Sequence, residues 1–180
     1  VKSDRVGKKI VWRNPAGLDS DQIEWLVQSY YQPYHRELSL KCALPGLKLG
    51  LDCHTMWAVN PPIANGGDER RPLVCLSNGG DEEGNPLPGQ KISAPGILIR
   101  QLAAALENGL TNWPTKKGPV VQINRPFTGG YITKRYGINE NQGIPWIQVE
   151  FNRELYLQNL PPSAEPDFVS FTKLKDLRKL

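Results

Sequence analysis

The sequence predicts an α/β domain in which helices flank a mixed, largely parallel sheet. Two observations support this prediction: short strand-like apolar runs recur along the chain, and stretches with helical periodicity lie between them. Their order is strand, helix, strand, strand, helix, strand, strand, helix. With 180 residues, 39% of them hydrophobic, the chain is long enough to bury one core. We therefore expect a single domain over residues 1–180.

The strand candidates combine apolar runs with flanking Gly, Pro and Asn residues. In WIQVEFN, Ile147, Val149 and Phe151 alternate with polar residues. Because side chains on a strand alternate between faces, one face of this strand should be apolar and the other polar. The predicted strands are residues 8–12, 47–53, 72–77, 119–127 and 146–152.

Three segments have the features of helices. The first begins at the N-cap candidates of residues 19–20 and carries an apolar and aromatic stripe to about Ala43, with a kink or break at Pro33. The second, GILIRQLAAALENG, has Ser93 as its N-cap candidate and ends near Gly109. The third is the amphipathic segment FTKLKDLRKL.

Composition narrows the class of protein. The net charge is +4, but the basic residues are scattered, which favours a solvated surface over a nucleic-acid-binding patch. No apolar run approaches the roughly 18–20 residues that span a bilayer, so we expect no membrane partner. Cys42, Cys53 and Cys75 form no CxxC pair, so we expect reduced, partly buried thiols in a cytoplasmic protein.

Asp52 and His54 follow a strand-like run. Residues two apart on a strand share a face, so these two side chains should point the same way and Cys53 the opposite way. A histidine here could bind zinc while the carboxylate fixes its tautomer, or it could be a structural hydrogen-bonding residue. The other histidine, His35, lies among tyrosines in the first helix and is expected to be structural.

Two further charged residues occur in or after predicted strands. Glu150 is either a general base for a metal-bound water or a partner for Arg153. Arg125 follows Asn124 and is either a fork for a carboxylate or a surface residue of a tight turn. Ligands of α/β sheets gather beyond the carboxyl ends of the strands. We therefore expect His54, Glu150 and Arg125 to converge there.

Several motifs together resemble the N-formylglutamate amidohydrolase family. LDCHTM, INRPFTGGYITKRYG and PWIQVEFNRELYL occur in the family's order and spacing, and YYQPYH and VWRNP also resemble its segments. The resemblance covers about residues 8–158. It implies a phosphorylase/hydrolase-like fold similar to that of zinc carboxypeptidases and aspartoacylases.

The resemblance also implies site residues and a cofactor. His54 would be a zinc ligand with Asp52 behind it, and Glu150 would be the general base and acid. Arg125, after Asn124, would hold a substrate carboxylate.

Arg13 would also face the substrate, although VWRNP departs from the family's usual Asp-x-Asn-Arg-Pro segment. The family's early histidine segment is absent, since no histidine precedes His35. We therefore expect either that the remaining zinc ligands precede Val1, so that the chain is a fragment, or that the metal has been lost.

The implied function is zinc-dependent hydrolysis of N-formyl-L-glutamate or a similar N-acyl acidic amino acid, a step of histidine degradation, which releases formate and glutamate. The expected partner is thus a small acidic amino-acid derivative, with no nucleic acid. The alternatives are an aspartoacylase-like or carboxypeptidase-like hydrolase of another substrate, and a metal-free binding module on the same fold.

Overall fold

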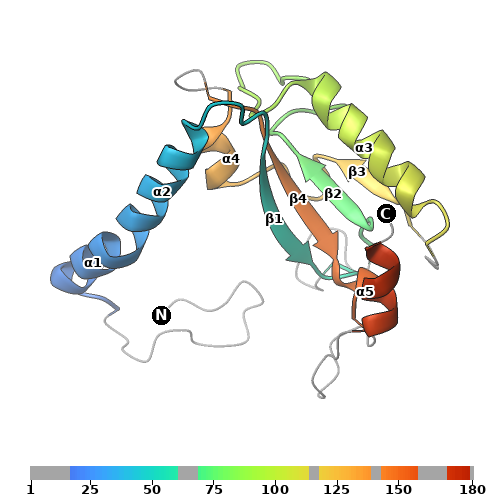
Figure 1. The fold of residues 1–180 in the computed structure, drawn as a ribbon, viewed down its shortest axis with the longest axis horizontal. Helices are drawn as coiled ribbons and strands as arrows, with labels where there is room; N and C mark the ends of the chain where they lie inside the picture. Colours follow the sequence, from blue (N-terminus) through green and yellow to red (C-terminus); the bar gives the residue numbers. More distant parts are fainter. Residues whose placement is uncertain (1–16, 61–68, 114–117, 139–142, 158–169, 179–180) are drawn as a thin grey trace.

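A mixed sheet forms the centre of the protein (Figure 1). The computed structural model describes residues 17–60, 69–113, 118–138, 143–157 and 170–178. Within them, the sheet contains β1 (Gly50–Met56), β2 (Val74–Ser77), β3 (Val121–Ile123) and β4 (Trp146–Asn152), in the order β1-β4-β2-β3. The β1–β4 and β2–β3 pairs are parallel, whereas β2 and β4 are antiparallel. The predicted α/β class with a largely parallel mixed sheet is confirmed, and predicted strand 8–12 lies outside the described residues.

The sheet has one apolar face and one polar face. Ile147 and Val149 of β4 lie in the core together with Val74 and Leu76 of β2. Helix α3 (Gly96–Leu110) adds its buried side chains to this cluster. The alternate residues of β4 therefore point away from α3, as the period of two predicts.

The first predicted helix is confirmed and runs without a break. It comprises α1 (Ser20–Leu26), a π-helical turn η1 (Val27–Tyr31) and α2 (Gln32–Cys42). Asp19 caps it by accepting a hydrogen bond from the backbone N–H of Gln22 at 2.8 Å. Of the expected kink or break at Pro33, a break does not occur, and the helix is instead distorted by the π-helical turn just before the proline. In this wider turn, the Gln32 N–H donates to the Val27 carbonyl. Pro33 itself has no N–H and so donates no backbone hydrogen bond.

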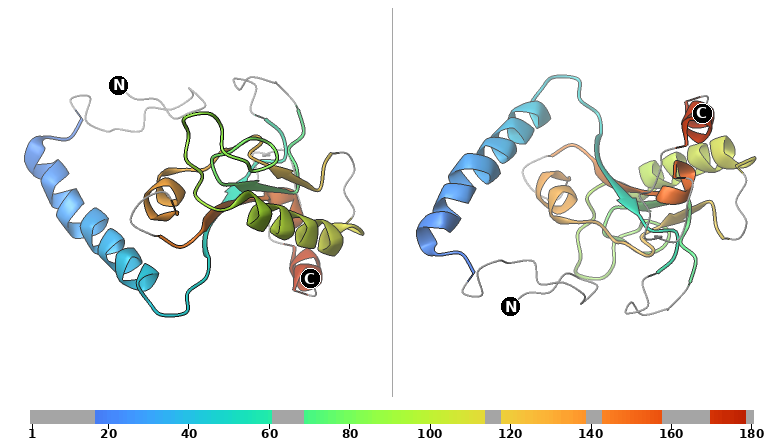
Figure 2. Two further views of the ribbon diagram at one scale, coloured as in Figure 1. Left: turned by 90° about the horizontal axis from the view of Figure 1, so that it is seen from above. Right: turned by 90° about the horizontal axis from the view of Figure 1, so that it is seen from below.

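This long helix extends away from the sheet (Figures 1 and 2) and contacts the rest of the protein through its aromatic residues. The Nδ1 of His35 lies 2.7 Å from the Tyr136 hydroxyl, and the two rings are stacked. Tyr31 and Tyr131 form a second contact between their hydroxyls. His35 is buried, so its predicted structural role is confirmed.

The remaining helices include one that the sequence did not predict. Helix α4 (Tyr131–Tyr136) lies between Gly130 and Gly137, where the sequence predicted no helix. The expected N-cap Ser93 is wrong, since Pro95 precedes α3 and the Ser93 hydroxyl donates to the carbonyl oxygen of Trp146 at 2.7 Å. A 3₁₀ turn η2 (Arg153–Leu155) follows β4, and α5 (Phe171–Leu177) comes last.

The cysteines differ in exposure more than the sequence suggested. All three are free: Cys42 is half-buried, Cys75 is buried and Cys53 is exposed. Cys53 is exposed because β1 is the edge strand of the described sheet. Its side chain is on the same face of the sheet as α3, but α3 does not extend as far as β1. Across the described ranges, no helix is long and apolar enough to cross a membrane.

Candidate active site

The polar face of the sheet brings together side chains from β1 and β4. Asp52 pairs in register with Gln148, and His54 pairs with Glu150. The Nε2 of His54 lies 3.0 Å from Oδ1 of Asp52. Asp52 and His54 thus share a face, as predicted, and the imidazole stands beside the Glu150 carboxylate, with about half of its side chain exposed.

Glu150 is the buried acid of this face. It is 7% exposed, and its Oε1 accepts a hydrogen bond from the side-chain amide of Gln148 at 3.2 Å. Burial raises the pKa of Glu150, while the charges of His54 and Arg71 act in the opposite direction. Since burial dominates, this carboxylate accepts a proton more readily than an exposed glutamate does.

Arg71 belongs to the same site, although the sequence did not single it out. It immediately precedes Pro72 and β2, and its Nε donates to Oδ1 of Asn60 at 2.8 Å. Its guanidinium carbon lies 5.0 Å from the ring centroid of Phe127. Burial lowers the pKa of Arg71, whereas the charge of Glu150 raises it. The amino end of β2 lies near the carboxyl end of β4 because these strands are antiparallel.

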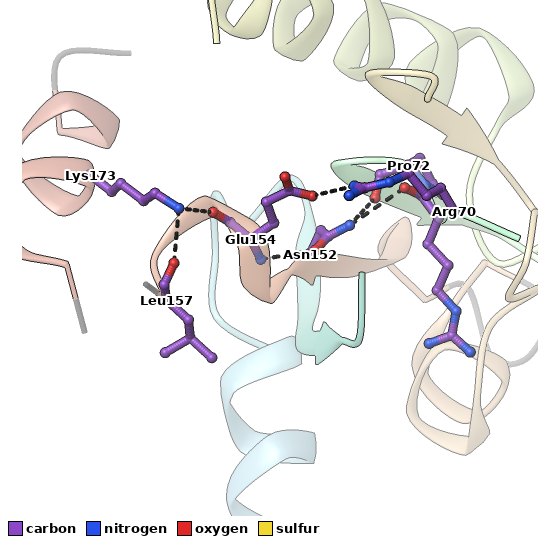
Figure 3. Close-up of polar contacts among 7 residues, drawn as sticks. Arg70, Pro72, Asn152, Glu154, Leu157 and Lys173 are labelled. Carbon is purple, nitrogen blue, oxygen red and sulfur yellow. Dashed lines mark hydrogen bonds and ion pairs between the residues drawn. The ribbon is translucent and has the colours of Figure 1, made fainter. Parts of the chain in front are cut away.

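The segment that carries Arg71 is held against the end of β4 (Figure 3). The side-chain amide of Asn152 donates to the carbonyl oxygen of Pro72 at 3.0 Å. The Nη1 of Arg70 donates to Oε2 of Glu154 at 2.9 Å. Lys173 in α5 donates to the Glu154 carbonyl at 2.8 Å and so ties this corner to the last helix. These contacts join segments that are far apart in the sequence.

Arg125 follows β3 at the edge of the described sheet. β3 runs parallel to β2 and therefore ends at the opposite end of the sheet from β1 and β4. Its Nη2 is 3.4 Å from Glu69 and its Nη1 is 3.7 Å from Glu82. The ends of these strands do not converge, because β3 runs in the opposite direction to β1 and β4. The chain after β3 nevertheless returns to the sheet, since the backbone of Arg125 hydrogen-bonds to the thiol of Cys75, the β2 residue in register with Glu150. That Arg125 converges with His54 and Glu150 stays a prediction. That Arg125 binds a substrate carboxylate stays a prediction.

A hollow of about 220 Å³ adjoins Arg125 at the edge of the sheet. It lies between α3 and β3, on the side of the sheet that carries the apolar core, so it is separate from the polar face around Glu150. The lining residues are Glu82, Ala103, Glu107, Val121, Gln122, Ile123 and Arg125.

Asn124 uses its side chain to hold the loop after β2. Its Oδ1 accepts from the backbone N–H groups of Asn78 and Gly79 at 3.0 and 3.2 Å. Its Nδ2 donates to Oδ1 of Asn78 and to the carbonyl oxygen of Asp81 at 2.8 and 2.6 Å. Since these contacts occupy the whole amide, the structure does not favour Asn124 as a substrate ligand. Arg13 lies outside the described residues.

The described residues supply at most part of a zinc site. Catalytic zinc sites have three protein ligands. Nowhere in the described part of the chain do three His, Cys, Asp or Glu side chains gather closely enough to hold a metal ion. His54 and its neighbouring carboxylates therefore do not fit a complete zinc site by themselves.

The fold and the site define an α/β protein with a buried carboxylate beside a histidine on the polar face of its sheet. The sequence model of the family described as N-formylglutamate amidohydrolase matches residues 2–157. The chain therefore belongs to the N-formylglutamate amidohydrolase family, an amidohydrolase family, as the motifs predicted.

The fold has a counterpart among solved structures. The crystal structure of N-formylglutamate amidohydrolase from Ralstonia eutropha JMP134 matches with a TM-score of 0.52 and 20% sequence identity. The match covers 77% of this chain and 45% of that chain, so this chain spans less than half the length of its structural relative. At this identity the likeness establishes the fold. A comparison with curated proteins found no match.

Proposed function

We propose that this chain carries the acid–base residue of an amidohydrolase that cleaves N-formyl-L-glutamate, or a similar N-acyl acidic amino acid, to formate and glutamate. The observation that carries the proposal is the buried Glu150 carboxylate beside His54, in a member of this family. The small acidic amino-acid derivative is its proposed partner.

Glu150 would act twice in the reaction. As a base it takes a proton from the water whose oxygen attacks the formyl carbon. As an acid it passes that proton to the nitrogen of the breaking C–N bond, so that formate and the free amine leave. A carboxylate whose pKa is raised by burial suits both steps, because it takes up a proton more readily than an exposed glutamate and can then pass it on.

The test is formate release by the wild-type protein and by Glu150→Gln. The amide keeps the shape of the side chain but cannot accept the proton. We expect kcat to fall by about 10²- to 10⁴-fold, the usual range for loss of a general base. Glu107→Gln is the matched control, because Glu107 is exposed on α3 beyond the other face of the sheet. A Glu150→Gln protein with wild-type turnover would show that Glu150 is a structural residue.

Substrate choice needs a separate measurement. A panel of formyl, acetyl and succinyl amino acids distinguishes the proposed reaction from that of an aspartoacylase-like or carboxypeptidase-like hydrolase. The metal-free binding module remains the second candidate, supported by the lack of a three-ligand group in the described ranges. It predicts saturable binding of the acidic amino-acid derivative without formate release from the wild-type protein.

We further propose that zinc is the cofactor and that His54 is one of its ligands, with the others outside the described residues. Bound zinc would polarise the formyl carbonyl and lower the pKa of water. His54 suits this role because Asp52 engages one ring nitrogen and the half-exposed ring presents the other.

Zinc content checks this assignment. We expect His54→Ala to lower the amount of zinc that copurifies with the protein by at least about tenfold. Loss of one residue that supports a metal site typically lowers metal affinity by at least that factor. Cys53→Ser is the matched control, because Cys53 is the neighbouring residue on the opposite face of β1. Equal zinc in His54→Ala and wild type would remove His54 from the ligand set.

A further inference from the structure

We propose that Arg71 binds the α-carboxylate of the substrate next to Glu150, so that the site selects N-acyl α-amino acids with a free α-carboxylate. This inference rests on the proposed function and assigns the anion-binding group of the same site. The assignment leaves the described contacts of Glu150 on the polar face unchanged.

The guanidinium of Arg71 is fixed in orientation and has free donors. Its Nε is used by Asn60, and its plane is supported by the ring of Phe127. Its two terminal nitrogens have no hydrogen-bond partner among the residues that the structure describes. Two parallel donors on a fixed guanidinium match the two oxygens of a carboxylate.

The backbone of Arg71 is also held in place. Its N–H donates to the carbonyl oxygen of Ala58 at 2.9 Å, and Asn60 N–H donates to the carbonyl oxygen of Glu69 at 3.0 Å. The contacts of Asn152 and Arg70 fix the same segment from the side of β4 (Figure 3). A guanidinium placed in advance costs little ordering when an anion binds.

The position of Phe127 places Arg71 beside Glu150. Cys75 is the residue of β2 that pairs in register with Glu150. The carbonyl oxygen of Phe127 accepts from the Ser77 hydroxyl at 2.6 Å and lies 3.6 Å from the Cys75 sulfur. Phe127 thus lies over the polar face at the strand next to Glu150, and Arg71 packs on its ring.

Arg71 also lacks the acidic partner that its neighbours have. Arg70 pairs with Glu154, and Arg125 is within 4 Å of Glu69 and Glu82. Arg71 is half-buried and forms no ion pair with any acid in the described ranges, Glu150 included. The charge of Glu150 acts on Arg71 without a direct ion pair, so the two terminal nitrogens of the guanidinium stay open to an anion supplied by a ligand.

The distance along the substrate favours the α-carboxylate over the side-chain carboxylate. Glu150 must reach the water that attacks the formyl carbon. The α-carboxylate is attached to the carbon next to the scissile nitrogen, whereas the side-chain carboxylate is two methylene groups further away. The α-carboxylate is therefore the carboxylate close enough to the scissile bond to meet a guanidinium beside Glu150.

The test measures binding of three ligands in the Glu150→Gln background, in which turnover is slow. The ligands are N-formyl-L-glutamate, its α-amide, and N-formyl-L-glutamine, which keeps the α-carboxylate. We expect Arg71→Gln to weaken binding of the two ligands with a free α-carboxylate by about 30- to 1,000-fold, and to change binding of the α-amide little. Arg71→Lys should restore part of the loss, because an ammonium cannot make the two-pronged contact.

Arg100→Gln is the matched control. Arg100 is an exposed arginine of α3 that donates to the carbonyl oxygen of Glu83, so its loss should leave the preference among the three ligands unchanged. Thermal melts verify that each variant is folded, and Arg71→Lys, which keeps the charge and much of the packing, is the variant to compare if Arg71→Gln fails to fold. The assignment is overturned if Arg71→Lys and Arg71→Gln keep the wild-type preference, or if all three ligands lose affinity equally.

Formate release by the protein with an intact Glu150 separates this inference from the proposed function. A protein that prefers a free α-carboxylate but releases no formate contradicts the proposed hydrolysis and leaves the assignment of Arg71 standing. A protein that releases formate equally well from N-formyl-L-glutamate and its α-amide supports hydrolysis and overturns the assignment.

Discussion

At the scale of the residue, Glu150 combines a buried position with an ionisable side chain. Its sequence neighbour Val149 lies in the core, while Glu150 itself faces Gln148 and His54 on the other side of β4. Burial disfavours the charged carboxylate, so this residue lowers the stability of the fold at neutral pH. Such a cost is expected at a site that needs a carboxylate ready to take a proton.

This cost predicts a pH-dependent effect of Glu150→Gln on stability. The folded-state pKa is raised above the ordinary value of 4.5, with His54 and Arg71 opposing the shift and Asp52 adding to it. Below 4.5 the carboxyl is neutral in both states and imposes no penalty. As pH rises through 4.5 towards the raised pKa, the unfolded chain ionises first, so wild type loses stability relative to the variant.

Urea denaturation of both proteins at several pH values measures the difference in free energy of unfolding. We expect Glu150→Gln to be the more stable protein at pH 7.5 and the gain to shrink towards zero at pH 4. Glu107→Gln, on exposed α3 surface, should show no such trend. A gain that is the same at both pH values would mean that burial of charge is not its cause.

At the scale of the element, periodicity predicted what each segment is but not which way it runs. The alternation in β4 placed Ile147 and Glu150 on opposite faces correctly, and the stripe after Asp19 predicted the first helix. Strand direction depends on pairing between segments far apart in the sequence. Arg71 was therefore missed, because β2 runs against β4 and its amino end lies at the carboxyl end of β4.

Short elements were also hidden from the sequence. Helix α4 has six residues between Gly130 and Gly137, too few for a helical period to stand out from the turn signals around it. Ser93 matched an N-cap by residue type, but its hydroxyl instead bonds the carbonyl of Trp146 in β4. In both cases tertiary contacts, which the local sequence does not show, decided the outcome.

The hydrogen bonds by which Asn124 connects the end of β3 to the loop after β2 predict that Asn124→Ala destabilises the fold. This change removes four hydrogen bonds and leaves alanine at a φ of 54°, in the left-handed region. At about 0.5–1.5 kcal/mol for each of the four hydrogen bonds, we expect a loss of about 2–6 kcal/mol in the free energy of unfolding. Gln122→Ala is the control, since the Gln122 side chain makes no hydrogen bond within the described ranges.

Ligand affinity tells the two possible roles of Asn124 apart. If Asn124 holds the loop, the folded fraction of Asn124→Ala should bind N-formyl-L-glutamate as wild type does. Weaker binding at unchanged stability would instead restore Asn124 as a substrate ligand.

At the scale of the whole molecule, the sheet separates stability from chemistry. Helix α3 lies on one side of the sheet (Figures 1 and 2), and the apolar core is on that face. The charged and amide side chains of β1 and β4 lie on the other face. The long helix formed by α1, η1 and α2 extends from this body and is joined to α4 by the rings of Tyr31 and His35. Its outward residues, such as Trp25 and Tyr30, are more than half exposed.

The alternation of faces along β1 and β4 constrains how this protein can change over evolutionary time. A substitution at His54 or Glu150 alters one group and leaves the rest of the face intact. A single inserted or deleted residue within either strand would instead turn every following side chain to the other face. It would move Glu150 into the core and Val149 or Phe151 out of it. We therefore expect inserted or deleted residues to be tolerated in the connections and not within these two strands.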